Sequence, residues 1–173
     1  MTKKEFMNLI ANGQEDILQK LLDLLNKMKI GYCVIGGLAV NAYVEPVVSL
    51  DLDLVVVAES LNRLIKSVGK LFNVEKFPHS INLSSSKSDL RIQLQTDPRY
   101  QAFISRSLLK DVMGYKMKVA TIEDVLQGKI WAYTDEERRK SKRQKDLADI
   151  FRLVETYPNL KDLLPESIRS IVF

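Results

Sequence analysis

A glycine pair, Gly36-Gly37, interrupts an otherwise apolar stretch and limits how the first third of this chain can fold. The residues before it, 30–35, read as a short buried strand, and those after it, 38–43, have helix-like spacing. Glycines at a strand-to-helix junction let the backbone approach a phosphate closely, and a helix that begins there offers free N–H groups. A tight turn that needs positive φ would explain the same pair without any ligand.

Two aspartates follow in the next apolar stretch. Alternation within residues 49–57 places Asp51 and Asp53 on one face of a strand and leucines on the other. Their Cα atoms would lie about 6.5–7 Å apart. That spacing suits Mg²⁺, which binds one or two carboxylates and completes its shell with substrate phosphates and water. The alternative is a strand end at which both aspartates simply face water.

Together the two elements resemble the signature of the nucleotidyltransferase superfamily. Its pattern is an apolar residue, Gly-Gly or Gly-Ser, a spacer of about a dozen residues, and then Asp-apolar-Asp. The similarity extends to residues 119–153, which look like the lysine helix and the Lys-Asp-x-x-Asp helix of the abortive-infection subgroup. The resemblance implies an α/β fold, with a mixed β-sheet flanked by helices and a helical C-terminal portion.

The resemblance also implies an activity and its participants. The activity is Mg²⁺-dependent transfer of a nucleoside monophosphate from an NTP such as ATP to an RNA or protein acceptor. The setting is a toxin–antitoxin or phage-defence module with a cognate partner protein. The implied catalytic and metal-binding carboxylates are Asp51, Asp53 and Asp89. The implied nucleotide-binding residues are Gly36, Gly37, Ser49, Lys129, Lys142, Lys145 and Asp146.

The chain departs from the family pattern in two places. The third carboxylate is expected on the strand over 89–95, where Asp89 or Gln93 could lie beside Asp53. With Gln93 there, a neutral amide replaces an anion, and the alternative is a non-catalytic protein that binds a nucleotide or a partner. No Arg or Lys stands shortly before Asp51, so a nucleotide contact there must come from Ser49 or from elsewhere.

Basic residues concentrate over 138–145, at the start of a predicted helix over 135–156. They could neutralise nucleic-acid or nucleotide phosphates, or simply form a solvated helix face. Lys142–Asp146 and Lys145–Asp149 have the i, i+4 spacing of helix ion pairs. Lys129, in a predicted helix over 121–133, either binds a phosphate or lies exposed with its stem along neighbouring aromatic rings.

Length and composition fit one globular domain of 173 residues, with 46% hydrophobic and 28% charged residues. We expect N-terminal helices over 1–29, an α/β core over 30–120 and a helical portion over 121–173. Helices are also predicted over 60–70 and 98–110, and strands over 71–77, 81–83 and 115–120.

No signal peptide or apolar run of about 18 residues is present, so a cytoplasmic protein without a membrane segment is expected. The lone cysteine, Cys33, excludes an internal disulfide and is expected to be buried. The lone histidine, His79, is expected in a surface turn, and a zinc site is improbable without a second His or Cys.

Overall fold

A seven-stranded mixed sheet forms the centre of the computed structural model, which describes all of residues 1–173. The strands are β1 (Tyr32–Ile35), β2 (Asp51–Val56), β3 (Asn73–Lys76), β4 (Ser80–Ser85), β5 (Ser88–Gln95), β6 (Leu108–Val112) and β7 (Tyr115–Val119). Their order across the sheet is β3-β4-β5-β2-β1-β7-β6. Two pairs, β1–β7 and β2–β5, are parallel and the other four are antiparallel. The expected mixed α/β architecture is confirmed.

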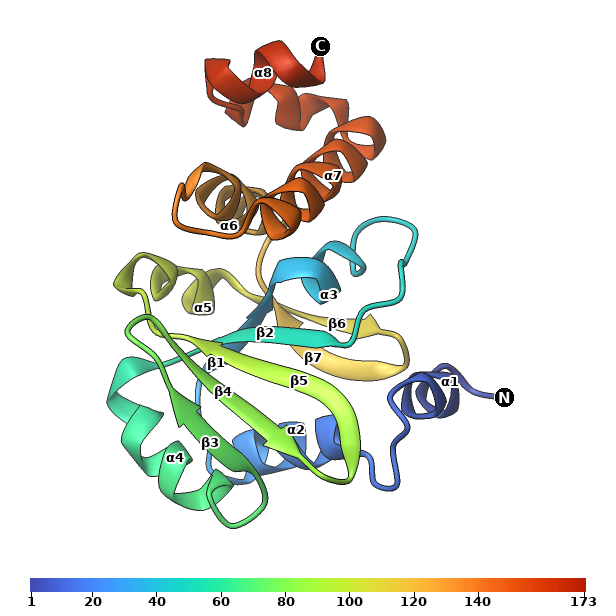
Figure 1. Cartoon of the computed structure of the whole chain (residues 1–173), viewed down its shortest axis with the longest axis vertical. Coiled ribbons are helices and arrows are strands. Elements are labelled where there is room, and N and C mark those ends of the chain that lie inside the picture. The colour runs from blue at the N-terminus through green and yellow to red at the C-terminus, as the bar shows by residue number, and fades with distance from the viewer.

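Helices lie on both sides of this sheet. They are α1 (Lys3–Ile10), α2 (Ile17–Lys27), α3 (Gly36–Val40), α4 (Leu61–Val68), α5 (Ala102–Arg106), α6 (Ile122–Thr134), α7 (Lys140–Thr156) and α8 (Glu166–Val172). Three short 3₁₀ helices, η1 (Ala58–Ser60), η2 (Pro98–Tyr100) and η3 (Pro158–Leu163), join them. In Figure 1, α2 and α4 lie below the sheet, whereas α6, α7 and α8 stack above it. None of the helices combines the length and apolar character needed to span a bilayer.

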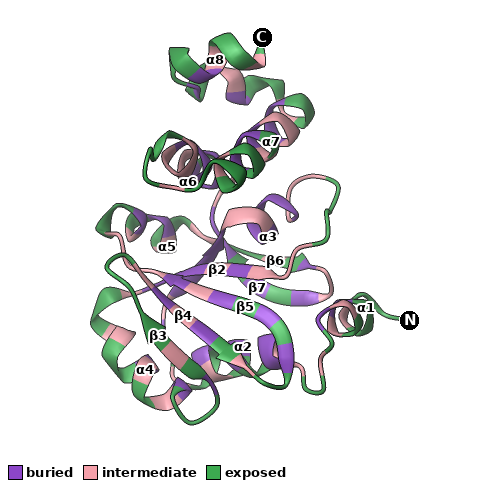
Figure 2. Ribbon diagram, viewed as in Figure 1, coloured by how far each residue is buried: buried purple, intermediate pink, exposed green.

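The core is one cluster of 44 buried hydrophobic residues that extends from Met7 in α1 to Ile168 in α8 (Figure 2). Cys33 in β1 is fully buried within it, and burial raises the pKa of its thiol to about 12. The exposed His79 lies in the turn between β3 and β4. Both expectations for these single residues are confirmed. The thiol is therefore a packing group and not a nucleophile.

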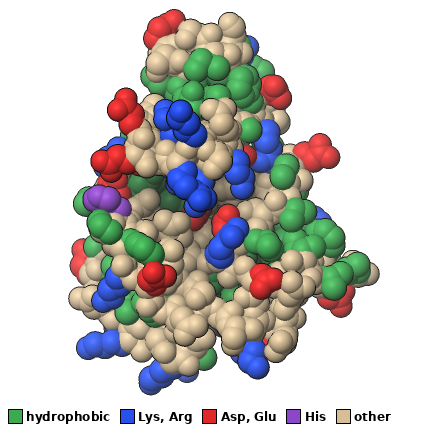
Figure 3. Space-filling view, in the orientation of Figure 1, with side chains coloured by type: hydrophobic (Ala, Val, Ile, Leu, Met, Phe, Trp, Pro, Cys, Tyr) green, Lys and Arg blue, Asp and Glu red, His purple; other side chains and the backbone are tan.

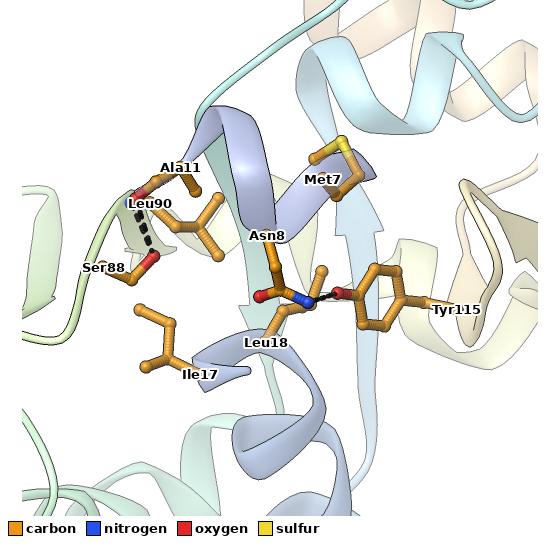
Figure 4. Close-up of a pocket in the computed structure, with 8 residues that line it drawn as sticks. All are labelled: Met7, Asn8, Ala11, Ile17, Leu18, Ser88, Leu90 and Tyr115. Carbon is orange, nitrogen blue, oxygen red and sulfur yellow. Dashed lines mark hydrogen bonds between the residues drawn. The ribbon is translucent and has the colours of Figure 1, made fainter. Parts of the chain in front are cut away.

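The N-terminal helix α1 begins at a capping box, in which Thr2 and Glu5 exchange side-chain-to-backbone hydrogen bonds. It docks on the sheet through Asn8, whose amide donates to the Tyr115 hydroxyl at 3.3 Å (Figure 4). That hydroxyl is also 3.0 Å from the Asp16 carboxylate, to which it donates. The cavity that Figure 4 shows below α1 measures about 10 Å³, which is room for one water at most.

Two predicted helix boundaries are wrong. Residues 98–110 were expected to be one helix, but η2 and α5 end by Arg106 and residues 108–112 form β6. The cause is a two-residue hairpin turn, since Met113 and Gly114 both have positive φ, of 53° and 87°. The helix expected from residue 135 begins at Lys140, because the Asp135 side chain accepts from the Glu137 N–H and stabilises a turn instead.

Candidate functional site

Strand β2 presents the two aspartates as its alternation predicts. Leu52 and Leu54 are buried, whereas Asp51 and Asp53 lie half-buried on the opposite face. Asp53 is directly opposite Ile35, the last residue of β1. Because the chain turns immediately after Ile35 into α3, the start of that helix is brought beside the Asp53 carboxylate.

The glycine pair touches this strand. Gly36 has φ of +72°, and a Cβ at that position would lie 2.5 Å from Asp53 Oδ2. A Cβ on Gly37 would lie 3.9 Å from the Ser49 hydroxyl, which accepts the Asp51 N–H at 3.2 Å. Gly36 therefore has both features that require a glycine: a backbone with positive φ and a close approach to the Asp53 carboxylate. We call Gly36, Gly37, Ser49, Asp51 and Asp53 the sheet half of the site.

The register of β5 decides which residue lies next to the aspartates. Asp53 is paired with Gln93, and Asp51 is paired with Arg91. The expectation that Asp89 lies beside Asp53 is therefore wrong, because Asp89 is two residues before Arg91, about 6.5 Å further along the strand. There the exposed Asp89 carboxylate accepts a hydrogen bond from the Asn12 amide at 2.6 Å.

Arg91 is a site residue that the motif did not include. Its Nε donates to Asp51 Oδ1 at 2.6 Å, and its side chain is 72% exposed. It supplies from the neighbouring strand the positive charge that residues 47–50 lack. Strand alternation in the sequence already puts Arg91 and Gln93 on one face of β5. It does not show that Arg91 lies beside Asp51, because that depends on the register between β5 and β2.

A buried ion-pair network lies in the helical portion. Lys129 of α6, only 8% exposed, donates to Asp146 at 3.0 Å and pairs with Asp149 at 2.9 Å. The Arg138 guanidinium also donates to Asp146, at 2.7 Å. The i, i+4 pairs Lys142–Asp146 and Lys145–Asp149 do not form, because the desolvated Lys129 requires both carboxylates. The alternative of an exposed Lys129 is also wrong.

Lys142 and Lys145 are exposed on α7 and form no ion pair. Figure 3 shows basic side chains gathered over α6 and α7 on this face. We call Lys129, Arg138, Lys142, Asp146 and Asp149 the helical half of the site.

The network continues from the helical half to the loop that carries Ser49. Arg152 pairs with Asp149 at 2.8 Å and donates to the Glu45 carbonyl oxygen at 2.7 Å. It also donates to the Asn41 side-chain oxygen at 3.0 Å, and Asn41 holds Val47 through two hydrogen bonds. Helix α7 thus fixes the segment between α3 and β2. Sequence patterns gave no signal for this contact, because its partners are more than 100 residues apart.

Charges of the two halves influence each other. Burial raises the pKa of the Asp53 carboxyl above its usual 3.8, and the neighbouring Asp51 adds to the increase. Lys129, Arg138 and Lys142 act in the opposite direction. Burial by itself lowers the pKa of an ammonium, but Asp149 and Asp146 outweigh it, so the pKa of Lys129 lies above its usual value. The cations of the helical half therefore favour negative charge at Asp53.

The donor set at β2 fits one Mg²⁺ ion better than two. Asp51 and Asp53 supply two carboxylates on one face, and Mg²⁺ commonly takes the rest of its shell from phosphates and water. A two-metal site needs at least three carboxylate or similar ligands. No group of three His, Cys, Asp or Glu side chains in the chain converges in that way. The amide of Gln93 stands where a third anion would be expected.

Three solved structures that share this fold are described as nucleotidyltransferases or adenylyl-transferring proteins. The lincosamide antibiotic adenylyltransferase LnuA, with lincomycin bound, is 14% identical at a TM-score of 0.56, over 82% of this chain and 98% of that one. ANT(2″)-Ia, in complex with adenylyl-2″-tobramycin, is 17% identical at a TM-score of 0.62, over 90% and 94%. A Thermotoga maritima protein assigned as a nucleotidyltransferase is 15% identical at a TM-score of 0.56, over 86% and 96%. No curated protein matches the chain.

These similarities establish the nucleotidyltransferase-type fold, and a family model gives the class of the protein. The model of one family, described as nucleotidyl transferase AbiEii toxin of type IV toxin–antitoxin systems, matches residues 32–171. The chain belongs to this AbiEii family. The resemblance based on Gly36-Gly37 and Asp51-Leu52-Asp53 is confirmed.

Proposed function

We propose that this protein is a Mg²⁺-dependent nucleotidyltransferase that transfers a nucleoside monophosphate from an NTP such as ATP to an acceptor hydroxyl. One observation carries the proposal: only a residue without a Cβ fits at Gly36, where a Cβ would lie 2.5 Å from Asp53 Oδ2, so the start of α3 and the Asp53 carboxylate lie close together. A triphosphate can therefore approach the α3 backbone while its bound cation reaches Asp51 and Asp53. Bound Mg²⁺ would neutralise phosphate charge at this point.

Each half of the site has a separate task in this proposal. Asp51 and Asp53 hold the cation, and Ser49 orients the Asp51 backbone through its hydrogen bond of 3.2 Å. With a cation held by Asp51 and Asp53, Arg91 would be available to a phosphate oxygen, since an exposed ion pair costs little to break. Lys142 has no acidic partner and is the α7 cation best suited to bind the triphosphate.

Lys129 acts differently from Lys142. It contributes positive charge from its buried position and holds Asp146, which in turn orients Arg138. Lys145, exposed and unpaired, extends the same basic surface and contacts the acceptor or the outer phosphates. Positioning and charge stabilisation by these groups account for most of the rate, as expected for phosphoryl transfer.

The acceptor in this proposal is RNA. Four exposed cations without acidic partners extend over the start of α7, and such a surface attracts a polyanion. They are Arg139, Lys140, Lys142 and Lys145. Transfer to a protein hydroxyl is the alternative outcome of the test below. As a member of a toxin family, the protein would act in the cytoplasm, where NTPs are available, together with a cognate antitoxin.

A second candidate function is nucleotide or partner binding without catalysis. Gln93 favours it, because a neutral amide beside Asp53 neither binds a second metal ion nor accepts a proton from the attacking hydroxyl. In that case NTP binding would persist in calorimetry, but no label would move from the NTP to RNA or protein.

The test is incubation with labelled NTPs, Mg²⁺ and total RNA or protein. Asp51→Asn and Asp53→Asn should each lower transfer by about 10³-fold or more, as expected when metal-dependent charge stabilisation is lost. Asp89→Asn is the matched control, since it makes the same change on the neighbouring strand and should retain transfer within a few-fold. Transfer that survives both β2 substitutions would contradict the proposal. A loss in Asp89→Asn equal to that in Asp53→Asn would restore Asp89 to the site.

A further inference from the structure

A second cavity, of about 370 Å³, lies between α5, α6 and η3. It has the size of small-molecule sites in proteins. Glu123, Gln127 and Ile130 line it from one face of α6, at i, i+4 and i+7, whereas Lys129 points from a different face of that helix. None of the ten residues that line the cavity belongs to either half of the nucleotidyltransferase site.

Flat aromatic faces form part of its wall. The Phe103 and Trp131 rings are parallel within 3°, with centroids 5.7 Å apart. The Arg99 guanidinium lies 4.7 Å from the Trp131 centroid, and that of Arg106 lies 5.8 Å from the Phe103 centroid. These contacts cover much of both rings, but Trp131 is only partly buried, so part of its ring remains accessible to another planar group.

The charges in the wall select against an anion. Arg99 is paired with Asp97 at 2.8 Å, and Arg106 forms a two-bond fork with Asp124 at 2.8 and 3.0 Å. A phosphate would have to displace a carboxylate partner from either guanidinium. Glu123 has no ion-pair partner, so the one unbalanced charge at the cavity is negative. The part of a ligand that lies inside the cavity should therefore be uncharged or positively charged.

We propose that this cavity binds a nucleobase that carries an exocyclic amino group. The base would lie against the accessible part of the Trp131 ring, because every nucleobase has a π-face. The Glu123 carboxylate accepts hydrogen bonds only, which matches an amino group. The Gln127 amide can both donate to and accept from the edge of the same base. Uracil fits poorly, because its ring N–H lies between two carbonyl oxygens that would face the carboxylate.

Trp131 makes the proposal directly measurable, since it is the only tryptophan in the chain. Adenosine, guanosine and cytidine should quench its fluorescence in a saturable way, and uridine should bind about tenfold more weakly, the effect of one hydrogen bond to a charged group. A short oligocytidylate tested beside cytidine distinguishes a base within RNA from a free nucleoside. If the ligand is a base within RNA, the oligonucleotide binds more tightly.

Glu123→Gln should weaken cytidine binding about tenfold. Glu166→Gln is the matched control, because Glu166 is also an exposed glutamate in the first turn of a helix but does not line the cavity, and binding should not change. Equal quenching by uridine and cytidine, or unchanged affinity in Glu123→Gln, would overturn the proposal. Quenching that disappears in Asp53→Asn would assign the nucleoside to the nucleotidyltransferase site instead. Failure of NTP transfer alone would leave the cavity proposal intact.

Discussion

The sheet half and the helical half of the site satisfy their charges in different ways. In the sheet half, Asp51 has one ion pair, with the largely exposed Arg91, and Asp53 has none. In the helical half, Lys129 is 8% exposed and lies between Asp146 and Asp149, which are held in turn by Arg138 and Arg152. The two carboxylates of β2 therefore share a single basic partner, whereas each of the two carboxylates of α7 has two.

This difference suits the sheet half to ligand binding and the helical half to stabilising the fold. An exposed ion pair contributes about 0–1 kcal/mol, so Arg91 can leave Asp51 at little cost when a cation approaches. Removing one partner of a buried pair costs about 3–5 kcal/mol, so the helical half holds its arrangement in the absence of ligand. In the proposed function, the sheet half would accept a cation, and the helical half would hold the basic surface of α6 and α7 in place.

The largest effect on stability is expected from Lys129→Met. This change leaves Asp146 and Asp149 buried without their shared ammonium, so the free energy of unfolding should fall by about 3–5 kcal/mol in urea denaturation. Lys142→Met, which alters an unpaired lysine on the adjacent helix, should change it by less than about 0.5 kcal/mol. A loss below 1 kcal/mol in Lys129→Met would show that the network does not support the fold.

A smaller loss is expected from Gly36→Ala. The residue has φ of +72°, and the new Cβ would meet Asp53 Oδ2 at 2.5 Å, so both strain and displacement of the carboxylate follow. We expect a loss of about 1–3 kcal/mol and weaker NTP binding in calorimetry. Gly37→Ala has no positive φ and meets only Ser49, at 3.9 Å, so its stability should stay close to that of the parent. Equal behaviour of the two variants would refute the close contact.

Asp53→Asn should instead stabilise the protein while it abolishes transfer. Burial raises the pKa of Asp53 from 3.8, so the folded state opposes its ionisation. The free-energy cost of ionising Asp53 in the folded state is absent below the pKa of the group in the unfolded chain and is complete above its pKa in the folded protein. The contribution of Asp53 to the free energy of unfolding therefore falls as pH rises. At pH 7 the variant should melt at a higher temperature than the parent. This difference should shrink as the pH is lowered towards 4, and an unchanged difference would contradict the assignment.

The smallest effect is expected from Arg91→Gln. Loss of an exposed pair should lower stability by no more than about 1 kcal/mol. Because Asp51 is then free, Mg²⁺ measured by calorimetry should bind up to about fivefold more tightly. Lys20→Gln, which removes another exposed ion pair far along the chain, should leave Mg²⁺ affinity unchanged. Weaker Mg²⁺ binding in Arg91→Gln would mean that the guanidinium assists the cation instead of competing with it.

Local pattern predicted much of the fold and the centre of the site. Alternation over 49–57 identified β2 and the shared face of Asp51 and Asp53, and the helix predicted over 121–133 corresponds to α6. The β6–β7 hairpin was missed, because residues 108–110 were assigned to the helix predicted over 98–110 and the turn at Met113-Gly114 was not recognised. The partners of Asp146 were missed as well, since the i, i+4 rule considers one helix and Lys129 lies on another.

The sequence alone determined the elements that need only neighbouring residues: the strand that carries two aspartates and the glycine pair that ends β1. These depend on periodicity and on backbone sterics, which act over a few residues. Only the tertiary structure decided that Gln93 and Arg91, not Asp89, lie beside those aspartates. Strands β2 and β5 pair across about 40 residues of intervening chain, and their register is set by packing of both strands in the core. The same long-range packing buries Lys129 and so assigns it both aspartates of α7.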